Sequence, residues 1–290
     1  MSVILPTQGE RSTIARALRS ALEQTHDSFE VVVVDDAVAN TGWVHDPTVA
    51  RALSDPRVRL VPWRQSRGCA AAKNAGLRAA RGEWVCYLDD DNEYLAGKVR
   101  AQHELAVSSG SPMVLCGLEM RVRHRRRRRQ IDAGGFSGDD LLLRAVPDTN
   151  VLFHRPGPDC WWDESLGTVD DACFFQALLA RHRLSRVPNV ATALVVYHVH
   201  TGQRANLGFE RFYRGQRCLL TRWARPYSRH ARRVLLLRSL IAFAKYREGG
   251  WGRLAHCGWA LLRTGGWREW RVIANACGVK VPGVRRWMVT

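Results

Sequence analysis

The stretch that decides the fold lies near the N-terminus and reads Glu30-Val31-Val32-Val33-Val34-Asp35-Asp36. Four valines in succession are typical of a strand that is buried on both faces of a parallel sheet. The same pattern, an apolar run followed directly by aspartates, occurs again in Trp84-Val85-Cys86-Tyr87-Leu88 and Asp89-Asp90-Asp91. Outward from these two runs, the apolar patterns predict strands at 2–6, 30–34, 58–62 and 84–88, alternating with helices at 10–24, 48–53 and 69–80. The first hundred residues therefore predict an α/β fold, with a mainly parallel sheet covered by helices on both faces.

The remainder of the chain shows weaker patterns. Apolar spacing predicts a helix at 95–108, a strand at 113–123, a helix that begins near 170 and a strand at 191–197. The run from His124 to Arg129 contains five consecutive arginines, whose charges repel one another. It predicts an exposed loop or hairpin tip, and a solvated loop is favoured over a binding role. Beyond residue 205 the patterns predict only helices, including an amphipathic one at 232–247.

The net charge is concentrated at the C-terminal end of the chain. The whole sequence has 44 Lys and Arg against 27 Asp and Glu, a formal charge of +17, but residues 1–200 hold 25 basic and 24 acidic residues. Residues 201–290 hold 19 basic and 3 acidic residues, together with six of the eleven tryptophans. The sequence therefore predicts a nearly neutral body followed by a basic, aromatic region.

The composition excludes several classes of protein. A hydrophobic content of 46% excludes global disorder. The eight cysteines include no Cys-x-x-Cys pair, so we expect scattered core thiols in a reducing cytoplasm rather than a disulfide or zinc framework. The apolar segment 234–244 is too short to span a bilayer and contains Arg238. The chain opens on Val3-Ile4-Leu5 with no basic residues before it, so no secretory signal is expected.

Both acidic clusters follow predicted strands. Ligands of parallel α/β sheets bind at the carboxyl ends of the strands, so the two clusters are expected to lie at a ligand site. Three consecutive carboxylates at 89–91 attract a cation, and oxygen ligands favour Mg²⁺ or Mn²⁺. The alternative is a solvated turn that caps the next helix, where aspartate favours the N-terminal dipole. The pair Asp35-Asp36 either binds a ribose or base edge or caps a turn.

Several further motifs follow one another in a characteristic order. They are Ser2-Val3-Ile4-Leu5-Pro6-Thr7, Ala17 to Thr25, Phe29 to Asp36, Arg67-Gly68, Ala72 to Leu77, Gly82-Glu83-Trp84 and Asp89 to Asp91. This series resembles glycosyltransferase family 2, the inverting nucleotide-sugar transferases of GT-A fold, specifically up to about residue 100 and more thinly to about 205. The resemblance implies a catalytic domain at 1–205, with nucleotide-sugar binding in 1–100 and the acceptor side in 101–205. The basic helical region would then occupy 206–290.

The resemblance also implies roles on the donor side. Pro6 and Thr7 stand where the first strand of the family meets the nucleotide. Asp36 matches the residue that bonds the nucleobase. Arg67 or Lys73 falls near the basic residue that helps to hold the base or the phosphates. These positions together imply a nucleotide-sugar donor, which we expect to be a UDP- or dTDP-sugar.

A metal site follows from the same resemblance. Asp89 and Asp91 match the ends of the family's DxD motif, in which Asp91 would be the direct metal ligand and Asp90 would lie close to the ribose or the metal. His200 keeps the position of a family histidine that could bind diphosphate or metal, whereas His198 stands where the family usually has arginine. The implied cofactor is Mn²⁺ or Mg²⁺, which would neutralise the nucleoside diphosphate leaving group.

The acceptor side is implied by two later segments. Trp162-Asp163-Glu164-Ser165 and the stretch from Asp170 to Phe175 resemble the acceptor-side region of the family. In a local pattern of the family, the aspartate just before Ala-x-Phe-Phe is the general base, which here is Asp171. An inverting transfer needs such a carboxylate to take the proton of the acceptor. Asp170 is the competitor for this role, and an ordinary helix N-cap is the alternative explanation for Asp171.

The sequence leaves several alternatives for the identity of the acceptor and for the partner of the basic region. The acceptor could be a small aglycone, free or presented by an acidic carrier protein, or a lipid-linked glycan, reacting through a hydroxyl or an amine. The basic region could meet an anionic membrane surface or an acidic protein, or its charges could merely face water, which is favoured. We expect a cytoplasmic protein, with a peripheral place at the inner face of the membrane as the alternative.

Nucleic-acid binding is the second class of function. It is suggested by the charge of +17 and the sequence pI near 10.4. No recognised nucleic-acid-binding motif occurs in the sequence, and the acidic strand ends would repel phosphates unless they held a metal. The glycosyltransferase hypothesis, with no nucleic-acid partner, is therefore favoured.

Overall fold

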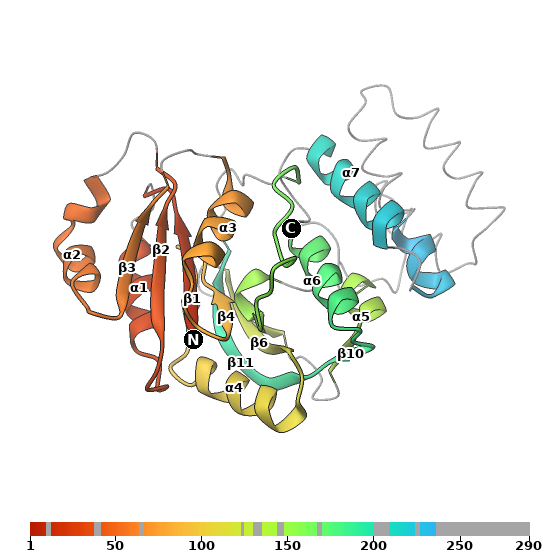
Figure 1. Cartoon of the computed structure of the whole chain (residues 1–290), viewed down its shortest axis with the longest axis horizontal. Helices are drawn as coiled ribbons and strands as arrows, with labels where there is room; N and C mark the ends of the chain where they lie inside the picture. Colours follow the sequence, from red (N-terminus) through yellow and green to blue (C-terminus); the bar gives the residue numbers. More distant parts are fainter. Residues whose placement is uncertain are drawn as a thin grey trace. The chain divides into compact units, whose positions relative to one another are not determined.

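The computed structural model describes residues 1–9, 13–37, 42–63, 67–122, 125–129, 135–143, 148–166, 170–199, 209–223 and 227–235. Within these ranges one mixed sheet of nine strands organises the body of the protein (Figure 1). The strand order is β3-β2-β1-β4-β9-β6-β11-β5, with β7 attached to β6. The strands are β1 (Ser2–Thr7), β2 (Glu30–Asp35), β3 (Val58–Pro62), β4 (Val85–Tyr87), β5 (Glu93–Tyr94), β6 (Met113–Val122), β7 (Arg125–Arg129), β9 (Phe153–His154) and β11 (Asn189–His198).

The first half of the sheet is parallel. β1 pairs with β2 and β4, and β2 pairs with β3, all in the same direction. The helices α1 (Ile14–Leu22), α2 (Pro47–Leu53) and α3 (Cys69–Ala79) connect successive strands. α3 packs closely on β1 because Gly76 has no side chain there: a Cβ at this position would lie 2.3 Å from Ile4 Cγ2. Residues 31–34 are completely buried, as their valine run predicts.

The second half of the sheet adds short antiparallel strands. β9 runs antiparallel to both β4 and β6, and β11 is parallel to β6. β5 pairs antiparallel with β11, and α4 (Lys98–Ser109) packs on β6 and β11. The six strands β1, β2, β3, β4, β6 and β11 therefore all run in one direction. The predicted α/β fold with a mainly parallel sheet is confirmed.

The smaller elements lie after β7 in the chain. They are β8 (Phe136–Ser137), α5 (Gly138–Leu143), the 3₁₀ turn η2 (Thr149–Val151), α6 (Asp170–Arg181) and β10 (Arg186–Val187), while another 3₁₀ turn, η1 (Gly42–His45), precedes α2. β8 and β10 form a separate two-stranded antiparallel sheet. The helix predicted to begin near residue 170 is α6, and its apolar residues Phe174, Phe175, Leu178 and Leu179 are buried. That prediction is confirmed.

Several predicted boundaries differ from the structure, most of them by one or two residues. The helix expected at 95–108 begins only at Lys98, because Glu93 and Tyr94 form β5 opposite Val196 and Val195. The strand expected at 84–88 is shorter, since β4 covers only Val85–Tyr87. The later start of α4 arises from this pairing across the sheet, which local periodicity does not show. The Trp84 carbonyl and the Leu88 N–H still bond to β1 at either end of β4, so the strand differs from the prediction only at its terminal residues. Residues 10–12 of the helix expected at 10–24 lie outside the described residues.

The arginine run is the clearest correction. Residues 125–129 form β7, which pairs antiparallel with β6 from Arg125 opposite Val122 to Arg129 opposite Leu118. The prediction of a solvated loop is therefore wrong for these five residues, which form one arm of a hairpin. Pairing with β6 satisfies backbone N–H and C=O groups, a contribution that the charge of the run does not reveal. His124 lies outside the described residues.

The described cysteines are present as thiols. Cys86, Cys116, Cys160 and Cys173 are buried, as expected of core thiols, whereas Cys69 is exposed and Cys218 is partly buried. Among the described residues there is thus no disulfide. Cys257 and Cys277 lie outside them.

The described residues from 209 onward belong to a second compact unit. They form α7 (Phe209–Cys218), a π-helical turn η3 (Leu219–Trp223) and a short helix at 229–235. All of these are helical, as predicted for the chain beyond 205, whereas most of the amphipathic helix expected at 232–247 lies outside the described residues. None of the helices in the described ranges has both the length and the apolar character needed to cross a bilayer.

Candidate active site

Polar residues from three strand ends meet at one edge of the sheet. The carbonyl of Thr7, the last residue of β1, accepts a hydrogen bond of 2.8 Å from the backbone N–H of Asp36, just beyond β2. Thr7 Oγ1 donates to a carboxylate oxygen of Asp90, beyond β4, at 2.7 Å. Pro6 precedes Thr7 in β1 and is buried. The structure therefore brings together four of the donor-side residues that the sequence indicates, because parallel strands present their carboxyl ends at the same edge.

Asp89 is held by a residue from a distant part of the chain. Asn150 Nδ2 donates to the Asp89 carboxylate at 2.8 Å, and the Asp89 backbone N–H donates to Asn150 Oδ1 at 2.7 Å. Asn150 lies in η2, is fully buried and donates its own backbone N–H to Asp148 at 2.9 Å. Burial, and after it the charge of Asp89, raises the pKa of Asp148 to about 6. Asn150 thus fixes both the backbone and the side chain of Asp89.

Lys73 is a buried cation among acidic groups. The residue is only 4% exposed, and its Nζ donates to Thr149 Oγ1 at 3.1 Å and lies 4.0 Å from Asp89 Oδ1. The same Nζ lies 4.4 Å from the centroid of the Trp162 ring. Burial alone would lower the pKa of Lys73, but electrostatic interactions with nearby acidic groups raise it above the ordinary value. These groups are Cys69, Asp89, Asp170 and Asp171.

Asp170 and Asp171 occupy the first turn of α6. Asp171 Oδ1 accepts a hydrogen bond from the adjacent N–H of Ala172 at 2.7 Å, which is not the bond to the second or third helical N–H that an N-cap makes. Burial, and then the charge of Asp170, raises the pKa of Asp171 to about 7, against an opposing effect of Lys73. A carboxylate with a pKa near neutral pH can accept a proton from a substrate. Lys73 therefore links the Asp89 end of the site to the Asp171 end.

The loop before α6 is tied to the middle of α3. Asn74 Nδ2 donates to the Trp162 carbonyl at 3.0 Å and to Glu164 Oε1 at 2.9 Å, while the Trp162 N–H donates to Asn74 Oδ1 at 2.8 Å. Arg67 pairs with Glu164 at 2.8 Å and keeps 57% of its side chain exposed. Arg67 therefore connects the residues just before α3 to the loop that precedes α6.

His198 binds the segment that follows the acidic triplet. Its Nε2 lies 2.5 Å from Glu93 Oε1, and its backbone N–H donates to Asn92 Oδ1 at 3.0 Å. Burial lowers the pKa of His198, although the bond to Glu93 opposes this shift. Arg16 also pairs with Glu93, at 3.3 Å, and donates to the Asp91 carbonyl at 3.0 Å. These contacts hold the backbone around Asp91, whereas His200 lies outside the described residues.

The carboxylates suit a hard divalent cation that is shared with a substrate. Among the described residues, no group of three or more His, Cys, Asp and Glu side chains could hold a metal by itself. Mg²⁺ commonly uses one or two carboxylates and takes its other ligands from substrate phosphates and water, and oxygen ligands also suit Mn²⁺. Asp89 and Asp91 supply carboxylates of this kind at the sheet edge. Their chemistry fits such a partial ligand set.

Sequence reasoning missed the triplet Asp148-Thr149-Asn150 and the roles of Asn74 and Glu164. Asn150 and Thr149 contact Asp89 and Lys73 directly. The available signal was this polar triplet immediately before the apolar run Val151-Leu152-Phe153. The acidic clusters at 35–36 and 89–91 follow apolar runs, whereas this triplet precedes one. Asn74 stands beside Lys73 in a motif of the family resemblance, but its partner could not be known from the sequence.

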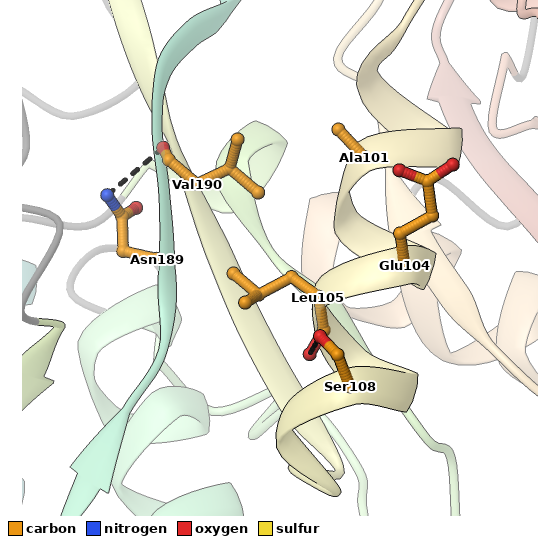
Figure 2. A pocket seen from close by; sticks show the side chains of 6 residues that line it. All are labelled: Ala101, Glu104, Leu105, Ser108, Asn189 and Val190. Atoms are coloured by element: carbon orange, nitrogen blue, oxygen red, sulfur yellow. Dashed lines mark hydrogen bonds between the residues drawn. The ribbon is translucent and has the colours of Figure 1, made fainter.

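The site is distinct from a cavity of about 420 Å³ between α4 and β11 (Figure 2). In Figure 2 the side chains of Leu105 and Val190 face each other across this cavity. The other lining residues are Ala101, Glu104, Ser108 and Asn189. None of the predicted site residues lines it, so the candidate active site is the polar edge of the sheet.

Several known proteins are similar to this chain in sequence. The family described as Glycosyl transferase family 2 matches residues 2–163. The succinoglycan biosynthesis protein ExoO of Rhizobium meliloti is 34% identical over 154 residues, which are 53% of this chain and 43% of that protein. The Escherichia coli UDP-Glc:α-D-GlcNAc-diphosphoundecaprenol β-1,3-glucosyltransferase WfgD is 32% identical over 104 residues, 35% of this chain and 39% of that enzyme. The matched segments thus span about two fifths of these relatives.

Solved structures share the fold. Staphylococcus aureus TarS 1–349, in complex with UDP-GlcNAc, is 18% identical and has a TM-score of 0.65, with 96% of this chain and 79% of that chain covered. The mannosyltransferase PcManGT from Pyrobaculum calidifontis, in complex with GDP-Man and Mn²⁺, is 20% identical and has a TM-score of 0.56, with the same coverage. These likenesses show the GT-A fold. With more than half of its length matched by the family, the chain is a member of glycosyltransferase family 2.

Proposed function

We propose that the protein is a metal-dependent inverting glycosyltransferase that moves a sugar from a UDP- or dTDP-sugar to a hydroxyl or amine of an acceptor. The observation that carries the proposal is the placement of Lys73. This buried cation lies 4.0 Å from the Asp89 carboxylate and interacts electrostatically with Asp171. It connects the strand-end carboxylates, which suit a nucleotide sugar and its metal, to a carboxylate with the pKa of a general base.

On the donor side, the edge formed by Pro6, Thr7 and Asp36 would receive the nucleoside. Asp36 is 2% exposed, and its backbone is fixed on Thr7, so its carboxylate would meet the nucleobase with little loss of conformational freedom. Lys73 and Arg67 would supply positive charge near the phosphates. Asp90 accepts a hydrogen bond from the Thr7 hydroxyl, which would hold its carboxylate in place near the ribose.

Asp91 and Asp89 would hold Mn²⁺ or Mg²⁺ together with the diphosphate, and His200 would contribute a further ligand. When bound, the metal would neutralise the charge that develops on the leaving diphosphate. In this chain, Asn150 keeps Asp89 oriented, and Arg16 keeps the Asp91 backbone in place. The complex of PcManGT with GDP-Man and Mn²⁺ supports the proposal that a divalent ion binds in this fold.

On the acceptor side, Asp171 would take the proton of the attacking hydroxyl or amine. Its raised pKa, about 7, makes it a stronger base than an ordinary aspartate. Asp170 raises that pKa through its charge, and Lys73 limits the rise. Asp171 would therefore be ionised in a large fraction of the molecules near neutral pH and would still bind a proton.

A lipid-linked glycan is the acceptor that we favour over a small aglycone or one presented by an acidic carrier protein. WfgD, whose name gives a diphosphoundecaprenol acceptor, supports this class, and ExoO is named for polysaccharide biosynthesis. Such acceptors lie at the membrane, so we propose a peripheral cytoplasmic location, with the basic residues of 206–290 near anionic lipids.

The direct test is a thermal-shift screen of UDP-, dTDP- and GDP-sugars with and without Mn²⁺. We expect one nucleotide class to raise the melting temperature, and to raise it more with Mn²⁺ present, because ligands that bind only the native state stabilise it. UDP and dTDP alone serve as controls for recognition of the nucleotide. The absence of stabilisation by every donor, with and without metal, would refute the proposal.

Asn150→Ala tests whether the hydrogen bonds of Asn150 hold Asp89 in position. We expect the free energy of unfolding to fall by about 1–3 kcal/mol, because the substitution leaves buried polar partners without their hydrogen bonds. We also expect weaker stabilisation by the donor with Mn²⁺. Urea unfolding and the thermal-shift assay measure the two effects. Asn189→Ala is the matched control, since this buried asparagine donates to the Val190 carbonyl at 3.1 Å and is not one of the residues of the candidate site. Equal loss of donor binding in both variants would show that Asn150 has no specific role in holding Asp89.

A further inference from the structure

Two consecutive tryptophans in the loop before α6 have opposite environments. Trp162 is 2% exposed and stacks on Phe174, with the ring centroids 4.0 Å apart. Trp161 is 43% exposed, which makes it one of the few large apolar side chains at the surface of the described chain. Trp162 is explained by the core and by its contact with Lys73. Trp161 has no such role, so its exposure needs another explanation.

Trp161 lines a cavity of about 280 Å³. The other lining residues are Leu77, Pro156, Gly157, Pro158 and Cys160. Trp161 Nε1 donates to the Pro158 carbonyl at 2.6 Å, and the Cys160 N–H donates to the Gly157 carbonyl at 3.0 Å. These bonds and the two prolines hold the indole ring in place before any ligand arrives, which lowers the entropy cost of binding.

One cation lies over the indole ring, and an ion pair lies at Gly157, on the border of the cavity. The Arg78 guanidinium carbon lies 5.1 Å from the centroid of Trp161. Arg181 Nη1 pairs with Asp159 Oδ2 at 3.1 Å, and the Asp159 side chain is 87% exposed. The loop passes close to Arg181 because residue 157 is glycine: a Cβ there would lie 2.4 Å from Arg181 Nη2. The cavity therefore combines an aromatic surface with hydrogen-bond donors and acceptors at its border.

This combination matches the chemistry of a pyranose ring. A pyranose presents C–H groups that pack on a flat aromatic ring through dispersion, and its hydroxyls lie around the rim, where charged side chains can bond them. Pockets for drug-sized ligands are about 300–1,000 Å³, so a cavity slightly below that range suits a single sugar ring. We infer that the cavity beside Trp161 is a subsite for one pyranose unit of the acceptor glycan.

The position of the cavity explains why this unit would be remote from the bond that forms. Leu77 and Arg78 follow Lys73 and Asn74 by four positions in α3, which is about one helical turn, or roughly 5.4 Å along the axis. Asn74 also bonds the backbone of Trp162, next to Trp161. The Trp162 backbone thus joins the loop of the cavity to α3 beside Lys73. Arg181, next to the cavity, is the last residue of α6 and lies ten positions, roughly 15 Å along the helix axis, from Asp171. The cavity therefore contains none of the carboxylates of the candidate active site and would hold a unit of the acceptor that is remote from them. This inference rests on the proposed function, because it assigns the cavity to the acceptor of that reaction.

The test is an NMR titration of the full chain with laminaritriose and with chitotriose, observed by saturation transfer. We expect at least one of these neutral trisaccharides to bind, and we expect Trp161→Ala to weaken that binding tenfold or more. Trp161→Phe keeps an aromatic ring and should restore most of the affinity. Val107→Ala removes another exposed apolar side chain, 65% exposed and located in α4, and should leave binding unchanged.

The outcomes separate the subsite from the proposed function. If neither trisaccharide binds, or if Trp161→Ala binds as well as the native chain, the subsite is refuted, while stabilisation by a nucleotide sugar would still support the transferase. If the trisaccharide binding depends on Trp161 but no nucleotide sugar stabilises the chain, the sugar subsite stands and the transferase proposal fails. Loss of binding in both Trp161→Ala and Val107→Ala would show a general effect on the protein and would also refute the subsite.

Discussion

Replacing Asp171 by asparagine is expected to lower turnover by about 10²–10⁴-fold, the range that a general base contributes. Asparagine has nearly the same shape as aspartate but cannot take a proton from the acceptor. The Kd of the nucleotide sugar should stay near that of the native enzyme, because the hydrogen bond that the Asp171 carboxylate accepts comes from the Ala172 N–H within α6. Release of the nucleoside diphosphate and a donor titration measure the two quantities. Near-normal turnover would refute the assignment of the base.

The pH dependence should report the same group. Because the pKa of Asp171 is raised to about 7, the carboxylate is protonated and inactive at lower pH and ionised above it. We therefore expect kcat/KM to rise with pH through about 7 and to level off above that value. An ordinary aspartate would already be ionised near pH 5, so a profile that is flat from pH 5 to pH 8 would contradict this role.

Asp170→Asn is the matched control for Asp171. It removes the neighbouring charge that raises the pKa of Asp171, so the rising limb of the pH profile should move to lower pH. Turnover above neutral pH should change much less than in Asp171→Asn. If Asp170→Asn instead abolished turnover and Asp171→Asn did not, Asp170 would be the base.

Asp91→Ala should remove the metal-dependent part of donor binding. At a donor concentration of 100 times the Kd, a bound donor adds about 2.7 kcal/mol to the stability of the native state. We expect the Mn²⁺-dependent share of this stabilisation to disappear in the variant, because the carboxylate that would hold the metal with the diphosphate is missing. Thermal shifts with and without Mn²⁺ at fixed donor concentration measure the change.

Glu83→Ala is the matched control for Asp91. Glu83 lies just before β4, whereas Asp91 lies just after it. The Glu83 side chain is 68% exposed and forms an ion pair with Arg155. Both substitutions remove one carboxylate near the same strand, but Asp91 follows Asp90, which bonds Thr7, whereas Glu83 stands at the opposite end of β4. Equal Mn²⁺-dependent stabilisation in the native chain and Asp91→Ala would rule out Asp91 as a metal ligand.

Much of the donor side could be predicted from the sequence. The valine run of β2 and the aspartates after β2 and β4 are local patterns, and parallel strands place their carboxyl ends together. The meeting of Thr7, Asp36 and Asp90 follows from these two facts. The start of α6 at Asp170 was also predictable, because its buried residues repeat with helical spacing.

The rest depended on contacts between distant residues. The short strands β5 and β9 exist only because longer strands pair with them, and β7 forms by pairing with β6 although its sequence predicts a solvated loop. No local pattern distinguishes such segments from loops. For the same reason the sequence indicated Lys73 as a donor-side residue but not as the link to Asp171.

The sequence by itself determined the fold class and the chemistry of the strand ends. Hydrophobic periodicity and the aspartates after the strands depend only on residues that are close together in the sequence. Only the tertiary structure decided how the carboxylates are held and tuned. Asn150 reaches Asp89 across 61 positions of the chain, and Lys73 reaches Thr149 across 76. The raised pKa of Asp171 likewise arises from burial and from Asp170 together. Burial and long-range pairing are properties of the packed chain, and they convert a set of aspartates into a candidate base and a candidate metal site.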